Sequence, residues 1–527
     1  MSLALIVGLA LFSPIFWWLV PFRYRIHFLL IVSIFLLYGL QSAPDLPHLT
    51  FVFPTTLVVM VIGVGLLIRP EALPKHWYWS VPCLAIIVWI VPSASPVTAL
   101  AKQIVSMGVG PALSGILSLT VLLGSVGISL APFLRKIPMS AILVAFGLIA
   151  FVARVIAPEI FPSTASPLER QAALLLVVPL LLGVIPFAIP ARIAVKGRSL
   201  TALIWLVLCI ALQVILKWPA LNLTFAQGFG GRFAIEWFSL SYVSFRLLHV
   251  VLDFRNGTLR LKDYSLVEFT VFALFFPTLS AGPITRLEAT VPQLRENLRH
   301  HDLNRTFAGI MRILIGLAKK FIVADLLGIV ALRPQMLGEA LPPTAVWLMM
   351  YAFLLMFYFD FSGYTDTAIG LGLLYGLKLP ENFERPFTKP NIAQFWQSWH
   401  ITLTTWFRLY WFVPFSRWAM KHGLQKRTQL VVLLAQLSTM SFIALWHQIT
   451  LGWWLWGVWQ GIGLFAFRLA SRPNDLVGSG RGSFVQHLMR GFCAWLTITY
   501  VALGFVFVAL PDVPHVLRFF GALLGCG

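Results

Sequence analysis

The chain has 527 residues, of which 59% are hydrophobic and only 11% carry a charge. Soluble globular domains have about 25% charged residues, so this composition excludes that class. The formal net charge of +20 would suit a nucleic-acid-binding protein. However, the basic residues lie mainly in alternate loops between apolar runs, which is the positive-inside pattern of a membrane protein. We therefore expect membrane lipids with anionic head groups, not nucleic acid, as partners of this charge.

Apolar runs long enough to cross a bilayer, roughly 17 to 25 residues each, recur along nearly the whole chain. They predict about fourteen to sixteen membrane segments. Backbone in lipid must satisfy its own hydrogen bonds and no alternating barrel pattern occurs, so the predicted fold class is an all-α, polytopic helical bundle. The predicted runs are 4–20, 27–41, 50–68, 79–95, 111–133, 138–157, 171–190, 200–217, 234–252, 266–283, 307–332, 344–376, 429–446, 451–468 and 490–510. The run 344–376 is long enough for two helices or one long broken helix.

The alternation of basic loops predicts the orientation of the chain. Clusters such as Arg23 with Arg25, and Arg255 with Arg260, are assigned to the cytoplasm, which places the N-terminus outside. The first apolar run lacks a basic start and a small-residue cleavage site, so we expect a retained helix rather than a signal peptide. The four cysteines include no C-x-x-C pair, so neither a disulfide framework nor a zinc site is indicated.

Composition divides the chain into three predicted parts. Residues 1–230 form hydrophobic helices with short polar turns, and 231–475 mix aromatic, glycine and charged residues at membrane depth. Residues 476–527 hold a loop, a last membrane helix and a tail. The loop, 473–489, is rich in glycine and serine and is expected to be exposed.

Three segments look too irregular for simple spans, namely 275–305, 379–415 and 358–377. In 275–305 the residues Leu287, Val291, Leu294 and Leu298 fall at helical spacing, which suits either an amphipathic helix at the membrane interface or a cytoplasmic loop. The segment 379–415 combines prolines, aromatics and polar residues, and we interpret it as a re-entrant or interfacial segment buried within protein.

Two histidines, His400 and His447, lie in segments that are otherwise apolar enough for the membrane interior. His400 occurs in FWQSWHITL and His447 in ALWHQ. An ionisable group in an apolar span is costly, and usually faces a protein interior or a water-filled cavity. Burial disfavours the imidazolium, and a neutral imidazole can accept a proton from a hydroxyl group. From this chemistry alone, His447 can be either catalytic or a structural residue that hydrogen-bonds between helices. The same two interpretations apply to His249 in SFRLLHVVLD.

Asp360 and Asp366 lie within a long apolar run. A charged side chain at the centre of a membrane helix costs about 2.5–3.5 kcal/mol on insertion scales. We therefore expect both carboxyl groups to be paired, hydrated or protonated, and a structural role is favoured over catalysis. Gly370, Gly372 and Gly376 are expected to permit close helix packing. No nucleotide-binding loop or metal-ligand spacing is present, so we predict no metal site.

Four motifs, in order, resemble the bacterial branch of the membrane-bound O-acyltransferase (MBOAT) family, which includes the alginate O-acetylation and teichoic acid D-alanylation membrane proteins. The resemblance covers roughly 235–470. The matching segments are FFPTLSAGPITR (275–286), FDFSGYTDTAIGLGLLYGLKLPENFERPF (359–387), NIAQFWQSWHITLTTWFRLYWFVP (391–414) and MSFIALWHQITLGWWLWGVWQGIG (440–463).

The resemblance implies specific roles. His447 maps onto the catalytic histidine of the family and His400 onto a second active-site histidine, both in a central funnel or tunnel. There an acyl thioester, such as acetyl-CoA or an acyl carrier protein, meets an acceptor from the other face, and no tightly bound cofactor is implied. Candidate substrate-binding residues are Trp396, Trp399, Trp406, Arg408, Gln448, Asp360 and Asp366.

The chain departs from the family pattern near both histidines, which puts its donor or acceptor preference in doubt. Gln448 replaces a usual glycine, Gln460 a usual histidine, and Leu409 a usual aspartate, while Gln397 and Ser398 replace arginines. The region 45–200 also holds more helices than the family pattern predicts.

These observations predict an inner-membrane enzyme that transfers a short acyl group, most simply acetyl, to a hydroxyl of an extracytoplasmic glycan or envelope polymer. A periplasmic or extracellular protein partner could complete the transfer, an expectation based on family analogy alone. Transfer of D-alanine from a carrier protein is the alternative within this class. A proton-coupled transporter or flippase is the alternative outside this class. Inverted-topology repeats would favour that alternative, and the sequence shows none.

Overall fold

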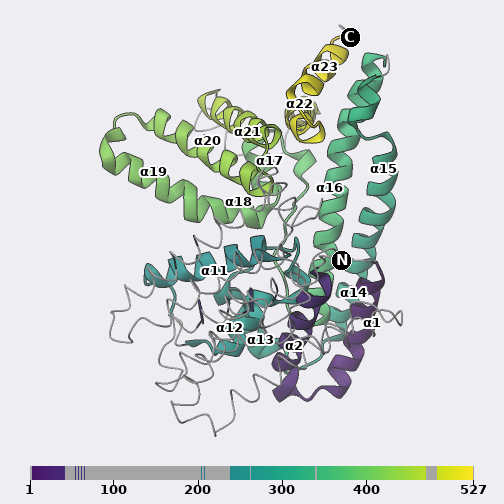
Figure 1. The fold of residues 1–527 in the computed structure, drawn as a ribbon, viewed down its shortest axis with the longest axis vertical. Helices are drawn as coiled ribbons and strands as arrows, with labels where there is room; N and C mark the ends of the chain where they lie inside the picture. Colours follow the sequence, from purple (N-terminus) through teal and green to yellow (C-terminus); the bar gives the residue numbers. More distant parts are fainter. Residues whose placement is uncertain are drawn as a thin grey trace, which may run out of the picture. The chain divides into compact units, whose positions relative to one another are not determined.

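The computed structural model describes residues 3–41, 238–260, 263–338, 341–470 and 484–525, with single positions between 54 and 207. Within these ranges the regular elements are helices (Figure 1). One isolated bridge pairs Phe383 with Trp399. The all-α prediction is therefore confirmed. Most runs predicted before residue 230, and the predicted domain boundary there, lie outside the described residues.

Four described helices are long and apolar enough to cross a membrane, and each corresponds to a predicted run. They are α2 (Phe22–Leu40), α16 (Pro343–Leu374), α20 (Thr428–His447) and residues Val485–Ala509 of α22 (Phe484–Ala509). The prediction of two helices or a broken one for 344–376 is wrong, because α16 is one continuous helix of 32 residues. Its glycines lie close to backbone atoms of neighbouring segments.

The chain divides into two compact units, residues 11–280 with 285–301, and residues 2–10 with 281–284 and 302–527. In the first, α12 (Leu266–Leu274) begins with a capping box made by Ser265 and Glu268. It packs on α2, where the hydroxyl of Ser33 accepts a hydrogen bond from the N–H of Phe276 at 3.1 Å. The other described helices of this unit are α11 (Leu240–Arg255), η6 (Phe276–Thr278) and α13 (Leu287–Asn297).

The amphipathic pattern in 275–305 does form a helix, α13. Leu287, Val291 and Leu294 on this helix and Leu298 at its end are all buried. The helical interpretation is thus confirmed, and the apolar face packs against protein within the first unit.

In the second unit, α14 (Leu303–Ala318), the π-helical segment η7 (Lys319–Ala324) and α15 (Asp325–Val330) continue one another with helical backbone. Together they correspond to the predicted run 307–332. One face packs along α16, as Figure 1 shows. The other exposes a row of large apolar side chains, as expected for a face turned to lipid. These include Phe307, Ile310, Leu314, Ile322, Leu326 and Ile329.

Glycines bring α14 and α16 into backbone contact. A Cβ atom added to Gly363 would lie 2.6 Å from the carbonyl oxygen of Gly316, and one added to Gly370 would lie 2.6 Å from that of Gly309. Backbone atoms cannot move aside as a flexible side chain can, so these positions admit only glycine. The expectation of close packing is confirmed for Gly370.

We expect Gly363→Ala to destabilise the protein by about 1–3 kcal/mol, because the added methyl group overpacks the α14–α16 contact. The measurement is the melting temperature of the purified protein in detergent. Gly491→Ala on α22 is the matched control, since nothing lies within 4 Å of its added Cβ atom. That variant should be neutral or gain up to about 1 kcal/mol from helix propensity. Equal melting temperatures for the two variants would contradict the close contact.

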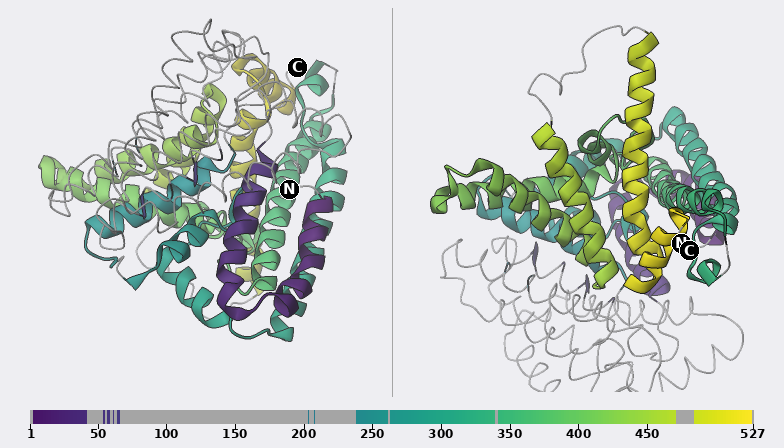
Figure 2. Two further views of the ribbon diagram at one scale, coloured as in Figure 1. Left: turned by 60° about the horizontal axis from the view of Figure 1, so that its bottom comes forward. Right: turned by 90° about the horizontal axis from the view of Figure 1, so that it is seen from above.

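The rest of the second unit is a series of short helices followed by three longer ones. After η9 (Pro386–Thr388), the chain forms α17 (Ile392–Ser398), α18 (Ile401–Phe407), η10 (Arg408–Phe412), α19 (Val413–Ala419) and η11 (Met420–Leu424). Helix α20 then packs along α21 (Leu451–Ala470), which also contacts α22, and these neighbours can be followed in Figure 2. The remaining described helices are α1 (Leu3–Leu19), η8 (Pro334–Gly338) and α23 (Val513–Leu523).

Two predictions about the C-terminal part need correction. The predicted loop 473–489 ends earlier, because α22 begins at Phe484, and its apolar first turns already favour helix. The predicted tail contains α23, whose start is fixed by Asp512. The carboxylate of Asp512 accepts the N–H of His515 at 2.9 Å, the contact of a helix N-cap, and Pro514 occupies the first turn.

Candidate active site

His400 lies between α17 and α18, where the helical backbone is interrupted. Its backbone is left-handed, with φ 45° and ψ 52°. A residue with a Cβ atom pays about 1–3 kcal/mol for such a conformation, which persists only where surrounding contacts enforce it. The strain places the imidazole on a turn instead of on a helix face.

Contacts with an earlier segment enforce this turn. The N–H of Glu384 donates to the carbonyl of Ser398 at 3.0 Å, and the N–H of Ile401 donates to the carbonyl of Asn382 at 2.9 Å. Phe383 and Trp399 form the isolated antiparallel bridge between these two bonds. The backbone on both sides of His400 is therefore held by a short two-stranded contact.

The imidazole of His400 is buried, with 3% of the residue exposed. Its ring centroid lies 4.8 Å from that of Phe361 on α16, in an edge-to-face contact. Neither ring nitrogen has a hydrogen-bond partner within the described part of the chain. A buried polar group without a partner is costly, which indicates that these nitrogens serve a ligand or a water molecule.

His447 is the last residue of α20 and is half-buried. Its ring stacks on Trp453 at a centroid distance of 4.8 Å and an angle of 20°. His447 lies in the same compact unit as His400, and aromatic contacts connect the surroundings of the two histidines. Gln448 follows in an extended conformation, and its exposed side-chain oxygen accepts the indole N–H of Trp453 at 3.1 Å.

A continuous set of aromatic contacts connects the surroundings of the two histidines. From Trp453, which stacks on His447, centroid distances of 5.7 Å to Trp456 and 5.6 Å from Trp456 to Trp396 lead to α17. Trp399, beside His400, stacks on Phe395 at 5.4 Å. Trp396 and Trp399 thus belong to one aromatic wall, whereas their place beside a substrate tunnel stays a prediction. Further members are Phe357, Tyr358, Phe383 and Phe505.

The other predicted binding residues of this segment lie along the helix that follows. Trp406 is buried on α18 and contacts Phe407 and Tyr410. Arg408 begins η10 and is exposed, and no ion pair involves it within the described part. Its guanidinium is therefore available to an anionic group.

Asp360 and Asp366 on α16 are both paired with cations from the neighbouring helix. The buried carboxylate of Asp366 accepts hydrogen bonds from Nε of Arg312 at 2.7 Å and from Nζ of Lys319 at 2.6 Å. Asp360 is more exposed and pairs with Lys320. The expectation of paired carboxyl groups is confirmed, whereas a role in substrate binding stays a prediction.

Comparison with known proteins places this constellation in a family. The model of the membrane-bound O-acyltransferase (MBOAT) family matches residues 195–503, more than half of the chain. The chain belongs to the MBOAT family. The match includes His400 and His447 together with the helices that hold them, so the resemblance predicted from four motifs is confirmed.

The curated relatives are named for acetylation or D-alanylation of alginate, teichoic acid or peptidoglycan. The chain is 32% identical over 295 residues to the probable alginate O-acetylase AlgI of Pseudomonas syringae pv. tomato, which covers 55% of this chain and 52% of that protein. It is 31% identical to the teichoic acid D-alanyltransferase of Streptococcus thermophilus, with 45% of this chain and 57% of that protein covered. It is 30% identical to the peptidoglycan O-acetyltransferase of Helicobacter pylori, with 49% and 47% covered. The chain thus spans about half the length of the curated relatives it matches.

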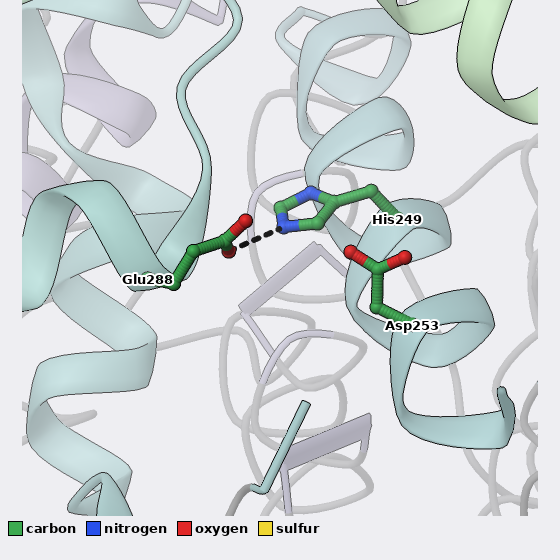
Figure 3. A group of neighbouring side chains, drawn as sticks. All are labelled: His249, Asp253 and Glu288. Carbon is green, nitrogen blue, oxygen red and sulfur yellow. Dashed lines mark ion pairs between the residues drawn. The ribbon is translucent and has the colours of Figure 1, made fainter. Parts of the chain in front are cut away.

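The MBOAT chain holds a second group of polar side chains, in its other unit. His249 and Asp253 on α11 and Glu288 on α13 offer ligand atoms that all lie within 4.8 Å of one another (Figure 3). Arg286, however, pairs with Asp253 at 2.9 Å and with Glu288 at 2.5 Å. The Nε2 atom of His249 accepts the N–H of Leu287 at 3.4 Å. Arg286 supplies the positive charge that a metal would bring, so these contacts favour a structural role that joins α11 to α13.

Several site residues had no signal in the sequence. Trp453, Trp456 and Phe505 belong to apolar runs, where one more aromatic is unremarkable, and their contacts with the histidine segments join distant positions. Arg312 and Lys319 could have been found, because cations in an apolar run call for carboxylate partners on a neighbouring helix.

Proposed function

We propose that this protein is a membrane O-acyltransferase that moves a short acyl group, most simply acetyl, from a thioester to a hydroxyl of a polysaccharide or cell-envelope polymer. The observation that carries the proposal is the set of aromatic contacts that leads from His447, through Trp453 and Trp456, to the helix directly before His400. Family membership supports the reaction class. The relatives' printed names, alginate O-acetylase and peptidoglycan O-acetyltransferase, support a polymer acceptor.

In the proposed reaction, His447 acts as general base. Its neutral imidazole accepts the proton of the acceptor hydroxyl as the oxygen attacks the thioester carbonyl carbon. The new C–O bond forms, the C–S bond breaks, and the imidazolium returns the proton to the leaving thiolate. Proton transfer of this kind contributes about 10²–10⁴ in rate. No oxidant, reductant or metal is required to balance the step.

His400 has a different setting and a different proposed role. It is more buried than His447, and the contact with Phe361 together with the strained turn fixes its ring. A fixed N–H near the thioester carbonyl would stabilise the negative charge that develops on its oxygen. We therefore assign His400 to polarising the donor carbonyl or orienting the acceptor.

The remaining predicted contacts fit a donor with an apolar and an anionic part. Trp396 and Trp399 would enclose the acyl chain, and the exposed Arg408 would contact a phosphate of the donor. Gln448, whose side chain bonds to Trp453, would border the entrance at His447. The donor is proposed to arrive from the cytoplasm and the acceptor from the other face of the inner membrane, with the N-terminus outside. The proposed protein partners are an acyl carrier protein and an extracytoplasmic acyltransferase.

The test is transfer of radiolabelled acetyl from acetyl-CoA to envelope polymer by membranes that contain the protein, compared with membranes that lack it. Label in the polymer supports acetyl transfer from this donor. A D-alanyl thioester on a carrier protein is the second donor to use, because one relative is a teichoic acid D-alanyltransferase. Absence of transfer from both donors, with the protein folded, would overturn the proposed function.

A further inference from the structure

Helix α18, which follows His400 directly, is capped by a residue other than its own N-cap. The first N–H groups of a helix have no partner within the helix, and the side chain of the N-cap residue commonly accepts them. Helix α17 follows this rule, because Asn391 accepts the N–H of Gln394 at 2.9 Å. At α18 the N-cap residue is His400, and its side chain makes no capping hydrogen bond.

The first N–H groups of α18 are accepted by Asn382, which lies eighteen positions before His400 in the chain. Its backbone carbonyl accepts the N–H of Ile401 at 2.9 Å. Its side-chain oxygen accepts both the N–H of Thr402 at 3.4 Å and the hydroxyl of Thr402 at 2.6 Å. Asn382 is completely buried. The first two N–H groups of α18 are thus directed to one distant residue.

Thr402 extends the connection to a third segment. Its hydroxyl oxygen accepts the N–H of Ile284 at 3.1 Å while its proton goes to Asn382. The segments around residues 284, 382 and 402 therefore meet at one buried hydroxyl beside the start of α18. The hydroxyl of Thr402 thus accepts from one segment and donates to another. Removing the side chain of Asn382 would leave this buried hydroxyl proton without its acceptor, which is costly.

We propose that Asn382 is a positioning residue for His400, an inference that rests on the proposed function. By capping α18 in place of the histidine, Asn382 leaves the imidazole free to turn toward Phe361 and the aromatic wall. Together with the Phe383–Trp399 bridge, it also holds the left-handed backbone from which the imidazole projects. Asn382 acts through His400 and not on the substrate.

The test compares Asn382→Leu, which keeps the approximate size but removes the acceptor, with the pair Thr402→Val and Thr402→Ser. Only the serine variant keeps the hydroxyl. We expect kcat for acyl transfer to fall about 10²-fold in Asn382→Leu, the loss typical of a misplaced catalytic group, with KM for the donor little changed. The kcat of Thr402→Val should also be lower than that of the wild type, and Thr402→Ser should retain most of the wild-type kcat.

Two comparisons separate positioning from simple loss of a cap. Asp302→Ala removes the N-cap of α14, where Asp302 accepts two backbone N–H groups, and should leave kcat unchanged at matched folded levels. Combining Asn382→Leu with His400→Ala should lower kcat no further than His400→Ala alone, because both changes remove the same contribution. A further fall in the double variant, or wild-type kcat in Asn382→Leu, would overturn the inference.

A readout independent of catalysis distinguishes failure of this inference from failure of the proposed function. Diethyl pyrocarbonate modifies accessible imidazoles, and mass spectrometry reports the rate at each histidine, with the exposed His422 as internal reference. We expect slow modification of His400 in the wild type and a clearly faster rate in Asn382→Leu. Equal rates at His400 would overturn the positioning role, whether or not the wild type transfers an acyl group.

Discussion

His447→Ala is expected to abolish acyl transfer to the polymer, with a loss of about 10²–10⁴ in kcat, because the general base of the proposed reaction is removed. Donor binding should change little, since the aromatic wall around Trp456 and Trp396 stays in place. The measurement is the rate of label transfer by membranes with matched amounts of folded protein. His447→Gln should be equally inactive, because an amide keeps much of the size and polarity but cannot accept the proton.

His422→Ala is the matched control for the loss of an imidazole. His422 is exposed in η11, bonds through Nδ1 to the backbone carbonyl of Trp418 at 2.8 Å, and has its ring contact with Trp418, which is not a member of the aromatic wall. Its removal should leave the transfer rate unchanged. Should His447→Ala retain the wild-type rate while His400→Ala loses it, the base would have to be His400, and the two proposed roles would be exchanged.

The sequence was sufficient to predict the features that stand out in a membrane protein, namely polar residues within apolar runs and the long apolar helices. An ionisable residue in an apolar run is costly to expose to lipid, so His400, His447 and Asp366 could be predicted to face protein or water. Apolar length also located α2, α16, α20 and α22. The run at 344–376 was misjudged because its length exceeds that of a usual membrane span. The adjoining helix α14 supplies the close backbone contact, and α14 and η7 supply the cations that pair with Asp366.

The finer structure of the site depends on contacts that spacing does not encode. The left-handed turn at His400 occurs at a residue type that rarely adopts it, and it requires the segment of Asn382 as a partner. Likewise, the stacking of Trp453 on His447 follows from the hairpin of α20 and α21. An apolar run rich in tryptophan predicts such contacts in general but not which rings meet.

Asp366→Leu is expected to destabilise the protein by about 3–5 kcal/mol, the second large effect. The variant removes the countercharge of Arg312 and Lys319, and breaking a buried ion pair from one side leaves uncompensated charge. The side chain of Asp366 is 7% exposed, against 54% for Asp360. Asp360→Leu should therefore cost only about 0–1 kcal/mol, as an exposed pair does. The melting temperature in detergent and the folded yield measure both effects.

A double variant tests whether charge balance is the cause. Arg312 also pairs with Glu381, so Asp366→Leu combined with Lys319→Met leaves Arg312 with one carboxylate and no unpaired cation. We expect the double variant to be more stable than Asp366→Leu alone, and equal or lower stability would contradict the ion-pair explanation. The same variant also decides the predicted binding role of Asp366. Wild-type KM values for donor and acceptor per folded molecule would confine this aspartate to the α14–α16 contact, whereas a raised KM would place it on the substrate path.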